Sequence, residues 1–182
     1  TAIPPSGKVI GARELQMITE ATLDGWLTTV RFNDQFQEKL ANFIGIPHVL
    51  TTTSGSSANL LALTALTSPK LGNRRLKAGD EVLVPTITFV APINAIKYCS
   101  GTPVFFDCDE HLNLKIEDVL FFLKHKTIVK KGFKYNSQSG KRIKAILLVH
   151  LYGNAVNINM ELIRECKKYK ILIVEDAAES YG

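Results

Sequence analysis

The chain has 182 residues, of which 46% are apolar and 21% are charged, and this length and composition are typical of a globular protein with one well-filled core. They exclude a collagen-like, coiled-coil or disordered chain, and no apolar run reaches the roughly 20 residues that a membrane span needs. The first residues show no secretory signal. The three cysteines are scattered without a Cys-x-x-Cys motif, so we expect no disulfide framework, no metal site and a reducing, cytoplasmic location.

The net charge of +5 comes from one segment of the chain. Residues 124–144 carry eight basic side chains and no acidic one, and without these eight the net charge would be −3. The eight are Lys124, Lys126, Lys130, Lys131, Lys134, Lys141, Arg142 and Lys144. A single local patch does not indicate a nucleic-acid-binding protein. It is either a solvated loop or a surface that attracts anionic ligands such as nucleotides.

Hydrophobic spacing predicts two helices in the first part of the chain. The first covers residues 12–24, where Leu15 and Ile18 recur at helical spacing. The second covers residues 34–44, with Asn33 as its N-cap. A strand over residues 48–53 follows, because this stretch is rich in β-branched residues.

The rest of the chain alternates between helices and strands. In order, we expect a tight turn at 54–57, a helix over 58–66, a loop over 68–80, a strand over 81–84, a helix from 92 to 99, a strand over 104–106, a helix over 116–123, a basic loop over 124–142, a strand over 143–149, a helix over 160–169 and a strand over 171–174. The later strands are continuous apolar runs. The sequence therefore predicts an α/β fold with a mostly parallel sheet covered by helices on both faces.

Ligands of such a sheet bind at the carboxyl ends of its strands, and three short motifs lie at those ends. Ser54-Gly55-Ser56-Ser57 joins a strand to a helix N-terminus, where free amides and the helix dipole bind an anion. It is neither a P-loop nor a Gly-x-Ser-x-Gly nucleophile elbow. The alternative interpretation is an ordinary helix start capped by Ser54.

The other two motifs are an aromatic residue and an acidic group. Phe89 follows strand 81–84, where its ring could stack on a planar ligand or pack in the core. Glu175, Asp176 and Glu179 follow the last strand, where a carboxylate can stabilise a proton on a ring nitrogen or cap a helix. A phosphate turn, an aromatic ring and an acid in this order match the binding of pyridoxal 5′-phosphate (PLP). His150, after strand 143–149, is interpreted as a hydrogen-bonded structural residue.

Nearly the whole chain resembles the DegT/DnrJ/EryC1/StrS family of nucleotide-sugar aminotransferases, whose members have the fold-type I architecture of PLP-dependent transferases. The resemblance rests on residues 25–29, 54–59, 79–85, 88–95, 103–107, 149–153 and 175–180. The part up to about residue 80 is similar to CDP-4-keto-6-deoxyglucose 3-dehydrases. The part from Glu81 onward is similar to LegC-type aminotransferases.

The resemblance implies a role for five residues. Gly55 and Ser56 would bind the PLP phosphate, Phe89 would stack on the ring, Asp176 would pair with the pyridine nitrogen, and Glu179 would lie near the phenolic oxygen. In the family, the lysine that binds PLP covalently lies downstream of the acidic motif. No lysine of this chain matches it, so the catalytic residue stays unknown.

The resemblance also implies a function. We expect residues 1–182 to be the N-terminal portion of the PLP-binding large domain, without the small C-terminal domain and inactive alone. The full-length homodimer would transfer an amino group from an amino acid, commonly glutamate, to the keto group of a nucleotide-linked sugar in deoxyamino-sugar and surface-polysaccharide biosynthesis. Three alternatives stay open: a 3-dehydrase of the same family that uses pyridoxamine phosphate, a non-enzymatic regulator on this fold, and a plain nucleotide-binding domain.

Overall fold

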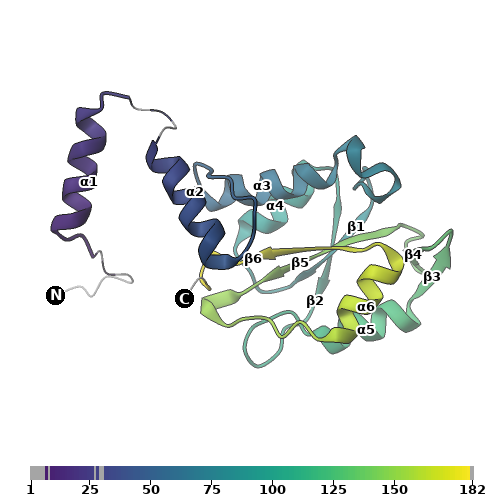
Figure 1. Cartoon of the computed structure of the whole chain (residues 1–182). Coiled ribbons are helices and arrows are strands. Elements are labelled where there is room, and N and C mark those ends of the chain that lie inside the picture. Colours follow the sequence, from purple (N-terminus) through teal and green to yellow (C-terminus); the bar gives the residue numbers. More distant parts are fainter. Residues whose placement is uncertain (1–6, 8, 27, 29–30, 181–182) are drawn as a thin grey trace. The chain divides into compact units, whose positions relative to one another are not determined.

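The computed structural model describes residues 7, 9–26, 28 and 31–180. Its elements are α1 (Ala12–Leu23), α2 (Arg31–Ile44), α3 (Gly55–Leu66), η1 (Pro69–Arg74), β1 (Glu81–Pro85), α4 (Val90–Tyr98), β2 (Thr102–Phe106), α5 (Ile116–His125), β3 (Thr127–Lys130), β4 (Phe133–Asn136), β5 (Ile143–Val149), η2 (Leu151–Gly153), α6 (Met160–Tyr169) and β6 (Leu172–Asp176) (Figure 1). They form two compact units, Thr1–Thr51 and Thr52–Gly182.

The smaller unit contains α1 and α2, and neither helix has a buried residue. Both predicted helices are confirmed, although α2 begins at Arg31, so Asn33 lies inside it and is not its cap. The strand predicted over 48–53 is wrong, because these residues have no strand to pair with in the described part of the chain. A β-branched run forms a strand only where a neighbour supplies the hydrogen bonds. Leu27 and Thr29 of the first family motif lie outside the described residues.

The larger unit is built on a parallel sheet with the strand order β2-β1-β5-β6. Alternate side chains of β1 and β5 point to opposite faces. Leu83 and Ile146 pack with α5 and α6, whereas Val84 and Leu147 pack with α3 and α4. Figure 1 shows these two helix pairs on opposite faces of the sheet. The predicted α/β class, with a parallel sheet between two helical layers, is therefore confirmed.

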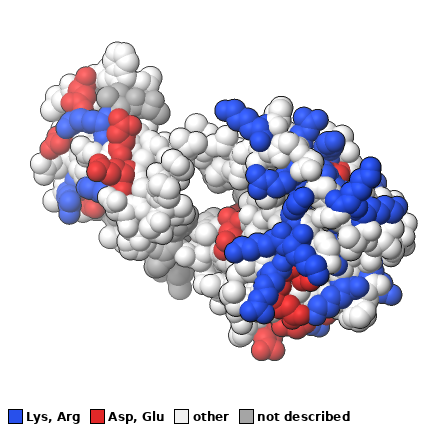
Figure 2. Space-filling model, turned by 45° about the vertical axis from the view of Figure 1, so that its right-hand side comes forward, with Lys and Arg blue, Asp and Glu red and all other residues white. Residues whose placement is uncertain are grey.

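The basic segment, residues 124–144, is folded into the larger unit. The interpretation of this segment as a solvated loop is therefore wrong. Strands β3 and β4 pair as an antiparallel hairpin across Lys131-Gly132, two residues with positive φ, which suits a tight two-residue turn. Three of its eight basic side chains, Lys134, Arg142 and Lys144, are buried. Figure 2 shows Lys and Arg side chains gathered on the surface of the larger unit.

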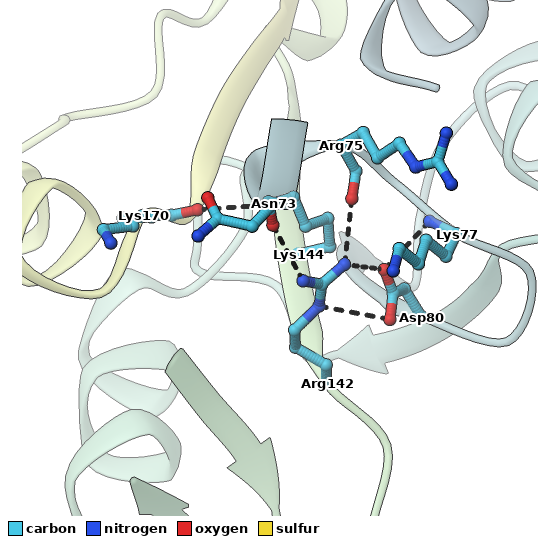
Figure 3. Close-up of polar contacts among 7 residues, drawn as sticks. All are labelled: Asn73, Arg75, Lys77, Asp80, Arg142, Lys144 and Lys170. Atoms are coloured by element: carbon cyan, nitrogen blue, oxygen red, sulfur yellow. Dashed lines mark hydrogen bonds and ion pairs between the residues drawn. The ribbon is translucent and has the colours of Figure 1, made fainter. Parts of the chain in front are cut away.

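Two of these buried basic side chains, Arg142 and Lys144, lie where β1 and β5 begin. The Arg142 guanidinium forms an ion pair with Asp80 and donates to the carbonyls of Asn73 at 3.0 Å and Arg75 at 2.8 Å (Figure 3). Lys144 has no exposed surface, and its Nζ donates to the Lys170 carbonyl at 3.3 Å. These contacts close the end of the sheet opposite the strands' carboxyl ends.

Among the residues that the structure describes, none of the helices combines the length and the apolar composition of a membrane span.

Candidate functional site

A pocket of about 460 Å³ lies where β1, β5 and β6 end and α3 begins. This volume is within the usual range of small-molecule sites. All five residues that the sequence predicts as cofactor ligands line the pocket: Gly55, Ser56, Phe89, Asp176 and Glu179. They come from three separate parts of the chain. Phe89 and the two acidic residues follow strand ends that the parallel topology aligns, and Gly55 and Ser56 begin α3, which packs on the same sheet.

The N-terminus of α3 forms one wall of the pocket. Ser54 caps the helix, since its Oγ accepts a hydrogen bond from the Ser57 amide at 3.1 Å. The cap makes the helix begin at Gly55, one turn earlier than predicted. Within the described part of the chain, the amides of Gly55 and Ser56 have no hydrogen-bond partner. The two interpretations of this turn are therefore compatible: Ser54 caps the helix, and the two amides after it are free to bind an anion.

Phe89 and Thr88 form a second part of the lining. Phe89 precedes α4 and is 70% exposed, so the interpretation of this residue as core packing is wrong. An exposed ring at a pocket wall offers a flat apolar face to a planar ligand. The Thr88 hydroxyl is buried and has no hydrogen-bond partner among the described residues. Unpaired buried hydroxyls are rare in folded proteins, and this one lies beside the pocket.

Asp176 is the last residue of β6, and its carboxylate is held from two directions. The Asn59 side-chain amide donates to Oδ2 at 2.8 Å, and the Ala178 backbone amide donates to Oδ1 at 3.2 Å. Leu172 and Val174 pack on the α3–α4 face of the sheet, so the alternation along β6 turns Asp176 toward α3. Residues 177–180 follow as a turn, and the Ala178 amide in this turn bonds to the Asp176 carboxylate.

The neighbouring residues Glu175 and His150 form a pair. Nδ1 of His150 accepts a hydrogen bond from the Val156 amide at 3.0 Å, and Nε2 lies 3.2 Å from Glu175 Oε2. Since Nδ1 accepts, a neutral ring carries its proton on Nε2, and this N–H donates a hydrogen bond to Glu175. His150 is 7% exposed and has both nitrogens engaged. It therefore has the hydrogen-bonded structural role that the sequence predicts.

Glu179 lies in the turn after β6 and contacts the segment that follows β5. Its carboxylate accepts a hydrogen bond from the Tyr152 backbone amide at 2.6 Å. The chain turns sharply here, with positive φ at Tyr152 and at Gly153. A Cβ on Gly153 would lie 3.2 Å from the Glu179 carbonyl, so the two segments approach closely. Glu179 thus connects the turn after β6 with the segment after β5 through this hydrogen bond.

Sequence reasoning missed Asn59 and Thr88. Asn59 follows Gly55 by one helical turn, which places the two on the same face of α3, so the spacing could have indicated it. Thr88 carries no such signal, because only the folded structure shows that its hydroxyl is unpaired. In the described part of the chain, no group of three or more His, Cys, Asp or Glu side chains is arranged to hold a metal ion.

A parallel α/β domain with free amides at a helix start, an exposed aromatic ring and a fixed carboxylate at one pocket has the features typical of a site for a small phosphorylated ligand. The family model of the DegT/DnrJ/EryC1/StrS aminotransferases matches residues 8–182. The chain belongs to this family.

Individual relatives agree with this assignment. The chain is 48% identical over its full length to the lipopolysaccharide biosynthesis protein RfbH of Salmonella typhimurium, of which it covers 38%. It is 31% identical to the GDP-perosamine synthase of Vibrio cholerae, with 99% of the chain and 43% of the relative covered. A crystal structure of a GDP-4-keto-6-deoxymannose-3-dehydratase with a trapped PLP–glutamate geminal diamine matches with a TM-score of 0.81 and 27% identity. That match covers 100% of this chain and 42% of the other.

The chain thus spans about 40% of the length of the relatives that it matches.

Proposed function

We propose that this chain is the cofactor-binding part of a PLP-dependent enzyme that transfers an amino group from an amino acid, glutamate above all, to the keto group of a nucleotide-linked sugar. The observation that carries the proposal is that one pocket has free amides at the start of α3 and, elsewhere in its lining, the fixed carboxylate of Asp176. A phosphate and a protonated ring nitrogen at the two ends of one ligand are complementary to these groups.

The remaining features of the pocket fit PLP as well. The phosphate would accept hydrogen bonds from the amides of Gly55 and Ser56, and the exposed Phe89 ring would cover the face of the pyridine ring. When bound, PLP supplies an electron sink for the carbanion that forms as an amino acid loses its α-proton. Asp176 would hold the proton at the ring nitrogen, because its negative charge favours the protonated form.

The relatives support the substrate class. Their names refer to lipopolysaccharide biosynthesis and to GDP-perosamine synthesis, and the similar crystal structure is of an enzyme that acts on a GDP-linked keto sugar. A role in making deoxyamino sugars for surface polysaccharides follows for the full-length protein.

A 3-dehydratase is the second candidate, and the match to the GDP-4-keto-6-deoxymannose-3-dehydratase favours it. Both reactions begin with an amino donor, but one ends with an amino sugar and the other with a sugar that has lost its 3-hydroxyl group. Full-length protein incubated with PLP, glutamate and nucleotide-linked 4-keto-6-deoxy sugars decides between them by mass spectrometry of the products. If the protein binds PLP and forms neither product, it is a regulator on this fold.

Asp176→Asn in the full-length protein tests the site itself. We expect this variant to bind PLP nearly as well as the wild type, because the α3 amides and Phe89 are unchanged. The rate of PLP conversion to pyridoxamine phosphate by glutamate should fall at least a hundredfold. Asparagine brings no negative charge to the ring nitrogen, and each ~1.4 kcal/mol added to the barrier slows the reaction tenfold. Single-turnover absorbance measurements follow this step, and a near-wild-type rate would refute the assignment of Asp176.

A further inference from the structure

We propose that Asn59 is a positioning residue for Asp176: its neutral amide fixes the direction of the carboxylate while leaving its negative charge free for the ligand. This inference rests on the proposed function, because the partner that Asp176 would face is the ring nitrogen of the cofactor. It adds a residue to which neither the sequence motifs nor the names of the relatives assign a role.

The contacts of Asn59 join the two ends of the pocket. Its Nδ2 donates to Asp176 Oδ2 at 2.8 Å and to the Gly55 carbonyl at 3.3 Å. Asn59 is 8% exposed, so water offers little competition for these hydrogen bonds. The start of α3, which would bind the phosphate, and the end of β6, which would hold the ring nitrogen, are therefore connected through one buried side chain.

The chemistry of an amide suits this role. Two hydrogen bonds, from Asn59 and Ala178, occupy part of the Asp176 carboxylate, which has about four lone-pair positions. Positions remain for a ring N–H. A lysine or arginine at position 59 would also orient the carboxylate, but it would form an ion pair and compete with the protonated ring. Asparagine orients the carboxylate and adds no charge.

A purely structural role for Asn59 is the alternative, and the chain offers a matched control. Asn136 is also 8% exposed, and its Nδ2 donates to the buried carboxylate of Glu81 at 3.0 Å. That pair lies at the start of β1, away from the pocket lining. Replacing either asparagine by leucine removes an amide donor from a carboxylate at similar volume, but only the carboxylate of Asp176 lines the pocket.

The experiment compares Asn59→Leu and Asn136→Leu in the full-length PLP-loaded enzyme. Its readouts are the thermal midpoint, the single-turnover rate with glutamate and the ¹⁵N NMR shift of PLP labelled at the ring nitrogen. We expect both variants to melt at lower temperature. Only Asn59→Leu should shift the ring-nitrogen signal toward the unprotonated form and slow the half-reaction, by about tenfold, which corresponds to about 1.4 kcal/mol. Asn59→Ala should act in the same direction if the leucine variant does not fold.

The outcomes separate this inference from the proposed function. An unchanged ring-nitrogen signal and rate in Asn59→Leu, or an equal rate loss in Asn136→Leu, would overturn the positioning role of Asn59. If Asp176→Asn also leaves the rate and the NMR signal unchanged, the proposed function itself is wrong.

Discussion

Lys144 shows, at the scale of one residue, how a buried charge changes the pH dependence of stability. It lies on β5 without exposed surface, and the only hydrogen bond of its side chain within the described residues goes to the Lys170 carbonyl. Burial, followed by the nearby positive charge of Arg142, lowers the pKa of Lys144 from 10.5 to about 8. The protonated side chain is therefore less stable in the folded protein than in the unfolded chain.

Lys144→Met should stabilise the protein most below pH 8. The unfolded chain keeps the lysine proton up to about pH 10.5, so between pH 8 and 10.5 it binds more protons than the folded state. Charged Lys144 therefore destabilises the folded protein fully at pH 7, and this effect disappears as the pH rises. At about 1.4 kcal/mol per pKa unit, its size is roughly 3 kcal/mol. Thermal midpoints of the two proteins should differ clearly at pH 7 and converge toward pH 10. A difference that does not depend on pH, or the same gain for the exposed Lys70→Met, would contradict this account.

The residues of the candidate site differ in how clearly the sequence indicates them. Phe89, Asp176 and Glu179 belong to short motifs just after strand ends, and a parallel topology brings such ends together. Gly55 and Ser56 were found from the small-residue turn that begins a helix, although no strand precedes it in the described part of the chain. Asn59 and Thr88 were missed because their importance depends on a partner, or on the lack of one, that only the tertiary structure supplies.

At the scale of the elements, local patterns succeeded where the core determined the structure. The strand over 143–149 and the helix over 160–169 were predicted with their observed bounds, because each has a long apolar run or a clear apolar face. The hairpin of β3 and β4 was missed, since its lysines read as a solvated loop. Lys134 of β4 is buried, with its ammonium over the Tyr169 ring and 3.5 Å from the Glu165 carboxylate. Both partners lie on α6, more than 30 residues away, so the local charge pattern does not indicate them.

Arg142→Met tests the element-level role of the buried ion pair. Arg142 directly precedes β5. Its guanidinium pairs with Asp80, the residue before β1, and donates to two backbone carbonyls at η1. Removing it leaves Asp80 buried without its cation, which costs about 3–5 kcal/mol in comparable cases. Urea unfolding of Arg142→Met should show a loss of that size. Lys141→Met removes the adjacent exposed charge and should change the free energy of unfolding by less than about 1 kcal/mol. Equal losses in both variants would argue against the buried pair.

At the scale of the whole molecule, a cluster of exposed apolar side chains predicts an interface with a partner. Leu60 on α3 and Val90 and Tyr98 on α4 line one shallow hollow and are 38%, 57% and 71% exposed. We call these three residues the α3–α4 apolar patch. Clustered exposed apolar side chains are typical of interfaces, and a second copy of the same chain is the commonest partner. The family resemblance implies the same arrangement, and Ser56 lines both this hollow and the candidate site.

We therefore expect the full-length protein to sediment as a homodimer and Tyr98→Glu to shift it toward the monomer. A carboxylate at the α3–α4 apolar patch would have to lose its hydration in a buried interface, which is unfavourable without a paired cation. Because the patch and the candidate site share Ser56, the monomer should also bind PLP more weakly. Phe121→Glu, at a 56% exposed aromatic residue on α5, is the matched control and should remain dimeric. Sedimentation velocity at several protein concentrations gives the result. A wild-type monomer with full activity would exclude the dimer, and a Tyr98→Glu protein that stays dimeric would place the interface elsewhere.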